Sequence, residues 1–163
     1  MRNGRNSTAS KNPRRRRLSK TVRSSQGEGA RYLVVGGMAM NQHGMLRATA
    51  AIDLLLERSR DNQDKVRKAL EILPDKAVRE MNETDLEEYT VVRVGDEIVV
   101  DLMLAACGVT YADAAGEVET KEVQGAAIPF ASAKLLLRTK QTYRERDIPD
   151  KIFLERKLRE QLS

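Results

Sequence analysis

The chain has 163 residues, of which 40% are hydrophobic and only 4% aromatic, so a core must be built from aliphatic side chains. One cysteine and one histidine exclude an internal disulfide and a Cys/His metal cluster. No apolar run reaches the roughly 18 residues that a membrane span needs. These features predict a protein without a membrane segment, in a reducing, cytoplasmic compartment.

The charge is distributed unevenly along the chain. Residues 1–28 contain nine basic residues and one acid, whereas the rest contains 20 basic and 23 acidic residues. Because this first segment is polar and nearly free of large apolar residues, we expect residues 1–29 to be a disordered basic tail and residues 30–163 to form the domain. The arginines at 14–17 could bind an anionic partner or simply be solvated.

The first predicted elements lie between residues 32 and 73. An apolar strand over residues 32–35 ends at Gly36-Gly37 and leads into a short helix over residues 38–44. A second strand is predicted at 51–57. An amphipathic helix follows at 61–73, with acids at its start and Pro74 at its end.

The second half of the sequence predicts further strands and two helices. Residues 90–94 and 97–103 flank Gly95-Asp96 and indicate a hairpin. Residues 118–130 contain one or two strands, and helices are expected at 131–141 and 148–162. A strand–helix–strand unit followed by a hairpin predicts an α+β fold with a mixed β-sheet and helices packed against it.

Two acids stand inside apolar, strand-like runs, Asp53 in AIDLLL and Asp101 in IVVDLM. A buried carboxylate is costly unless a cation pairs with it. If the two strands are adjacent and in register, both acids converge on one point. Mg²⁺ is a hard cation that takes carboxylate and phosphate oxygens. Gly36-Gly37, placed between a strand and a helix, offers backbone N–H groups to a phosphate.

These residues resemble the polymerase-β-type nucleotidyltransferase superfamily, closest to small prokaryotic members linked to toxin–antitoxin systems. The resemblance covers residues 31–158 and implies a nucleotidyltransferase-like fold. The first motif is GG-x-A-x-x-x-H-G-x-x-R-x-T, followed by the strand of Asp53. In this chain it consists of Gly36, Gly37, Ala39, His43, Gly44, Arg47, Thr49, Ile52 and Asp53. The matching residues further along are Asp101, Lys140, Arg144, Arg146, Asp147 and Asp150.

The resemblance implies transfer of a nucleoside monophosphate from a nucleoside triphosphate to a hydroxyl group. The acceptor would be a partner protein such as a toxin, an RNA or a small molecule. Mg²⁺ is the implied cofactor, and Asp53 and Asp101 would be both metal ligands and catalytic residues. The implied nucleotide-binding residues are Gly36, Gly37, Arg47, Lys140 and Arg144.

The chain departs from this family at Ala51, where the first acid of an acid–x–acid pair belongs. A methyl group removes a ligand that the two metal ions would share, so we expect transfer to be impaired on the order of 10²-fold or more. An inactivating substitution and a natural loss both explain this residue. The family also usually carries an apolar helix before the first strand, and none is evident in this sequence.

Other interpretations remain open. The fold could be a non-catalytic, antitoxin-like module that binds a nucleotide or a partner, or the basic tail could bind RNA electrostatically. Arg47 could be solvated, and Lys140 and Arg144, one helical turn apart, could form a solvated basic face. A structural role is expected for His43, Asp147 and Asp150, and a small buried apolar role for Cys107.

Overall fold

The computed structural model describes residues 13–162, with side chains from residue 19 onward. Its α-helices are α1 (Pro13–Gly27), α2 (Gly36–Gln42), α3 (Arg60–Leu70), α4 (Asp85–Glu88), α5 (Ala133–Thr139) and α6 (Ile148–Gln161). Short 3₁₀ turns follow at Ala77–Glu80, Ala112–Ala114 and Glu145–Asp147.

Six strands form the main sheet, in the order β3-β4-β2-β1-β8-β7. They are β1 (Tyr32–Val35), β2 (Ile52–Leu56), β3 (Val92–Gly95), β4 (Val99–Met103), β7 (Val118–Val123) and β8 (Ala126–Ala131). Strands β2 and β4 are parallel, as are β1 and β8, while the other neighbouring pairs are antiparallel. A small hairpin of β5 (Ala105–Ala106) and β6 (Val109–Thr110) stands apart from this sheet.

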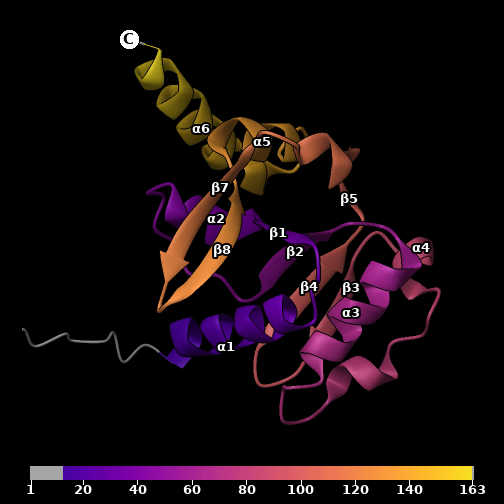
Figure 1. Cartoon of the computed structure of the whole chain (residues 1–163). Helices are drawn as coiled ribbons and strands as arrows, with labels where there is room; N and C mark the ends of the chain where they lie inside the picture. The colour runs from indigo at the N-terminus through magenta and orange to yellow at the C-terminus, as the bar shows by residue number, and fades with distance from the viewer. Residues whose placement is uncertain (1–12, 163) are drawn as a thin grey trace, which may run out of the picture.

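Helices cover both faces of the sheet. Helices α1 and α3 lie together on one side, and α2, α5 and α6 gather on the other (Figure 1). All four residues of β1 are buried, as expected for a central strand that is covered on both faces. The predicted α+β class with a mixed sheet and packed helices is therefore confirmed, and each predicted strand and helix from residue 32 onward has a counterpart in the structure.

Helix α1 corrects the expectation for the basic tail. Disorder was expected over residues 1–29, but residues 13–27 form a helix directly before the first strand, while residues 1–12 lie outside the described part. The helix docks through small side chains, because Ser19, Thr21, Val22 and Ser25 are all buried. The Ser24 hydroxyl donates to the Ala69 carbonyl at 2.9 Å, so polar contacts add to limited apolar burial.

No helix within residues 13–162 combines the length and the apolar character that crossing a lipid bilayer would require.

Candidate functional site

The two strand acids lie side by side. Strands β2 and β4 are parallel neighbours, and Asp53 is paired in register with Asp101. Because paired residues on adjacent strands point to the same face, the two carboxyl groups meet at one place. Asp101 is 7% exposed and Asp53 is half-buried. The convergence that the sequence predicted from two separate apolar runs is therefore present.

The proximity of the acids perturbs the titration of Asp53. Burial and the neighbouring Asp101 charge raise the pKa of Asp53 to about 6, the Lys140 charge opposes this, and a hydrogen bond with Asp101 adds to it. Among the described residues, no basic side chain lies within ion-pair distance of Asp53. This carboxyl group therefore faces a like charge without a direct counter-ion.

The glycine pair packs directly against the acid. Gly36 has a φ of 67°, and a Cβ atom built there would lie 1.9 Å from Oδ2 of Asp53. A Cβ atom on Gly37 would lie 2.4 Å from Cγ2 of Thr49. Only glycine fits either position, so the backbone of this turn approaches the acid pair more closely than any other residue would allow.

One cavity of about 680 Å³ contains all of the predicted site residues. Its lining includes Gly36, Gly37, Arg47, Ala51, Asp53, Asp101, Lys140 and Arg144. These residues come from the ends of β1 and β2, the loop between them, β4, and the segment that follows α5. Residues far apart in the sequence thus surround one space large enough for a nucleotide.

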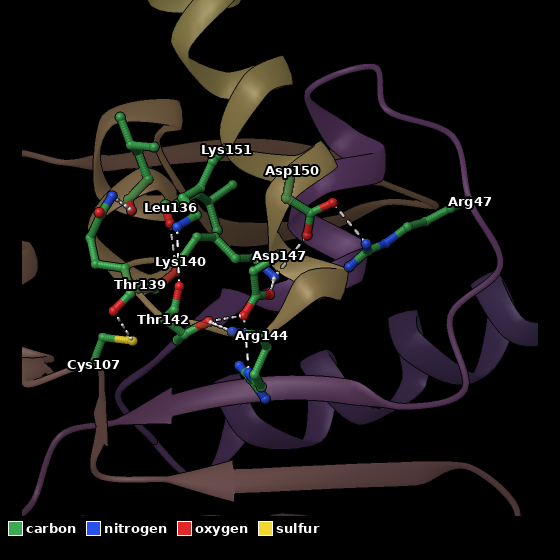
Figure 2. A network of polar contacts seen from close by, with 12 residues as sticks. Arg47, Cys107, Leu136, Thr139, Lys140, Thr142, Arg144, Asp147, Asp150 and Lys151 are labelled. Atoms are coloured by element: carbon green, nitrogen blue, oxygen red, sulfur yellow. Dashed lines mark hydrogen bonds and ion pairs between the residues drawn. The ribbon is translucent and has the colours of Figure 1, made fainter.

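The segment after α5 is held by buried ion pairs (Figure 2). The Nζ atom of Lys140 lies 3.0 Å from Oδ2 of Asp150 and 3.5 Å from Oδ1 of Asp147, and all three side chains are at most 10% exposed. Nη1 of Arg47 donates to Oδ1 of Asp150 at 2.8 Å. Asp150 therefore ties the loop that carries Arg47 to the start of α6. Asp147 and Asp150 were expected to be structural as charges at a helix N-terminus, and these ion pairs add a role that the sequence did not predict.

Lys140 and Arg144 both line the cavity, but they do not lie on one helix as predicted. They were expected on one face of a helix, but α5 ends at Thr139 and Arg144 lies in the turn beyond it. Both side chains contact Asp147: Lys140 forms an ion pair with it, and Nε of Arg144 donates a hydrogen bond to it at 3.0 Å. Asp147 also accepts a hydrogen bond from the Thr142 hydroxyl. Although burial opposes it, these contacts and the Lys140 charge lower the pKa of Asp147.

Two other residues, His43 and Cys107, were predicted to have structural roles. His43 follows α2, and its Nε2 lies 2.9 Å from the Ala131 carbonyl, consistent with its predicted structural role. The prediction for Cys107 is wrong, because this residue is exposed in the tight turn of the β5–β6 hairpin, with a φ of 48°, and lines the cavity.

Sequence reasoning missed Arg93. This residue stands directly opposite Asp101 on the antiparallel strand β3. Its Nε donates to Oδ1 of Asp101 at 2.8 Å and its Nη2 donates to Oδ2 at 2.9 Å, which makes a bidentate pair. The only signal for it in the sequence was the hairpin around Gly95-Asp96, whose register determines which residue faces Asp101.

These contacts limit which metal could bind. Within residues 13–162, no group of three or more acidic, histidine or cysteine side chains is arranged to hold a metal ion. Asp53 and Asp101 offer two carboxylates, and both oxygens of Asp101 are engaged by Arg93. The donors fit one hard cation when Arg93 releases Asp101, but they do not fit a two-metal centre.

No protein-family model and no curated protein matches this sequence.

Proposed function

We propose that this chain is a nucleotidyltransferase scaffold that binds a nucleoside triphosphate in the 680 Å³ cavity. The observation that carries the proposal is the pairing of Asp53 with Asp101 beside a glycine turn that leaves no room for a side chain. Backbone N–H groups of such a turn suit phosphate oxygens. The basic residues Arg47, Lys140 and Arg144 line the same space and suit the charge of a triphosphate.

The reaction that this scaffold would support is transfer of a nucleoside monophosphate. An acceptor hydroxyl oxygen forms a bond to the α-phosphorus, the bond to the bridging oxygen breaks, and pyrophosphate leaves with the electron pair. The hydroxyl proton passes to a carboxylate, for which Asp101 is the proposed group. A Mg²⁺ ion held by Asp53 and Asp101 would neutralise phosphate charge. The acceptor hydroxyl would belong to a protein, an RNA or a small molecule.

Ala51 is the reason to expect weak transfer from this chain. It lines the cavity two residues before Asp53, on the same side of the extended chain. Its methyl group supplies no oxygen, so the acid cluster has two members rather than three. We expect a rate on the order of 10²-fold or more below that of a chain with an acid at this position.

Comparison of three proteins tests this proposal. The unsubstituted chain with Ala51, called the natural chain in these comparisons, is incubated with α-³²P-labelled nucleoside triphosphates, Mg²⁺ and candidate acceptors. Ala51→Asp and Ala51→Asn, whose amide is uncharged and nearly isosteric with the carboxylate, are treated in the same way. Release of labelled product and pyrophosphate is measured. We expect transfer by Ala51→Asp at about 10²-fold or more above the other two proteins. Equal inactivity of all three, with triphosphate bound by each, contradicts the catalytic part of the proposal.

A second candidate function has its own supporting observation. The bidentate pair between Arg93 and Asp101 occupies the carboxylate that would serve as base and metal ligand. A site arranged in this way suits a module that binds a nucleotide, or an antitoxin-like module that binds a partner, without chemistry. Retained triphosphate binding together with inactivity of Ala51→Asp would favour this alternative.

A further inference from the structure

Arg93 lies where it can contact both the acid pair and a ligand. Strand β3 is at the edge of the sheet, and the Arg93 side chain crosses to Asp101 while remaining 64% exposed. Its guanidinium has five N–H donors, of which the bidentate pair uses two. Because Arg93 also lines the cavity, the remaining donors are available to whatever occupies that space.

The cavity as a whole has an excess of positive charge. Five basic residues line it, whereas only three acidic residues do. The basic residues are Arg47, Arg93, Lys140, Arg144 and Arg146, and the acids are Asp53, Asp101 and Asp147. An acid at position 51 would reduce this excess and add a metal ligand, but alanine is present. Asp150 does not line the cavity but pairs with Arg47 and Lys140, which leaves an excess of one positive charge. The site therefore favours an anion over a free divalent cation.

We infer that the Arg93 guanidinium takes the place of a divalent cation, linking Asp101 to the triphosphate, so that this chain binds triphosphates without metal. The inference rests on the proposed function, which places the triphosphate in this cavity. A metal ion in such a site bridges carboxylate and phosphate oxygens. A guanidinium does the same with hydrogen bonds, because its planar fork matches both groups.

The geometry also explains why a metal would compete poorly. Both oxygens of Asp101 already accept hydrogen bonds from Arg93, so a cation must either displace the guanidinium or share these oxygens with it against the repulsion of its positive charge. Asp53 is then the one carboxylate left for Mg²⁺, which without substrate phosphates has too few protein ligands to bind tightly. Removing the guanidinium should therefore create a dependence on metal that the natural chain lacks.

Titration calorimetry with inorganic tripolyphosphate, in EDTA and in Mg²⁺, tests the inference. For the natural chain, we expect affinities within about threefold of each other in the two buffers. For Arg93→Gln, we expect an affinity in EDTA lower by about tenfold or more, because one charge-assisted contact is lost. Adding Mg²⁺ should restore much of the tripolyphosphate affinity that Arg93→Gln loses in EDTA. Binding of Mn²⁺ alone, followed by electron paramagnetic resonance, should be tighter in Arg93→Gln than in the natural chain.

Arg79→Gln is the matched control. Arg79 is 60% exposed and pairs with the Glu71 carboxylate at 3.3 Å, but it does not line the cavity. This variant should behave like the natural chain. If Arg93→Gln does not fold by circular dichroism, Arg93→Lys replaces it. Lysine keeps the positive charge but lacks the planar, bidentate guanidinium, so we expect the tripolyphosphate affinity in EDTA to fall by about threefold or more.

The inference is overturned if tripolyphosphate fails to bind the natural chain in EDTA, or if Arg93→Gln binds it there equally well. These outcomes are separable from failure of the proposed function. Transfer by Ala51→Asp with metal-dependent triphosphate binding by the natural chain refutes only the role of Arg93. Metal-free binding that depends on Arg93, with no transfer by any variant, refutes only the catalytic proposal.

Discussion

Replacing Asp53 with Asn should stabilise the fold at neutral pH. Asp53 is half-buried against Asp101, and among the described residues it has no ion-pair partner. Its pKa is raised to about 6, first by burial and then by the Asp101 charge. An asparagine keeps the shape and the capacity for a hydrogen bond, but it removes the charge that the site accommodates poorly.

The size and the pH dependence of this effect follow from the pKa. A rise from 3.8 to about 6 corresponds to a free-energy penalty of about 3 kcal/mol, which solvent screening of a half-buried group reduces to about 1–2 kcal/mol. Because the folded-state pKa lies above the unfolded-state value, the penalty is absent below pH 3.8, grows as the pH rises, and is complete above about pH 6.

Thermal unfolding at two pH values, followed by circular dichroism, measures this difference. At pH 7.5, Asp53→Asn should unfold about 3–6 °C above the natural chain, whereas at pH 4 the two should nearly coincide. Asp64→Asn is the control, since Asp64 is an exposed acid on α3. A lower melting temperature for Asp53→Asn at pH 7.5, or an equal gain at both pH values, would refute this electrostatic explanation.

Two further substitutions test the packing of the site by urea unfolding. Gly36→Ala places a methyl group 1.9 Å from the Asp53 carboxylate at a φ of 67°, so we expect a loss of about 2 kcal/mol or more. Lys140→Met removes the cation between Asp147 and Asp150, which are 2% and 0% exposed, and this should lower the free energy of unfolding by about 3–5 kcal/mol.

Each of these two substitutions has a matched control at an uncrowded or exposed position. A Cβ atom on Gly95 would meet nothing within 4 Å, so Gly95→Ala should change stability far less than Gly36→Ala. Lys68 is 73% exposed and lies 4.0 Å from its acidic partner, so Lys68→Met should be nearly neutral. Similar losses within either matched pair would contradict the role assigned to the site residue.

Hydrophobic patterning was sufficient to predict the centre of the fold. The apolar runs around Asp53 and Asp101 predicted two strands. Adjacency in register was a condition of that prediction, and the structure meets it with a parallel pair. The turn at Gly36-Gly37 could be predicted too, because it directly follows an apolar strand. The structure shows why glycine is needed there, since the backbone lies too close to the Asp53 carboxylate for a side chain. Local sequence was informative here because each strand carries its own apolar signal.

The parts that were missed depend on register and on distant contacts. A two-residue turn at Gly95-Asp96 would pair residue 94 with residue 97 and place Thr90 opposite Asp101. The structure pairs Gly95 with Val99 instead, and this shift brings Arg93 to the acid. Helix α1 was missed for a related reason, since its buried serines and threonine look polar until the helix packs against α3 and β8.

Asp150 has a consequence for the order in which the molecule is assembled. It lies at the start of α6, yet it holds Arg47, which is 103 positions earlier in the chain. A nascent chain on the ribosome can form β1 and β2 well before Asp150 emerges. Until then the loop with Arg47 lacks its ion-pair partner, and Lys140 has only Asp147 as a counter-ion. The side of the cavity that Arg47 and Lys140 line therefore reaches its final arrangement only after synthesis has passed this residue.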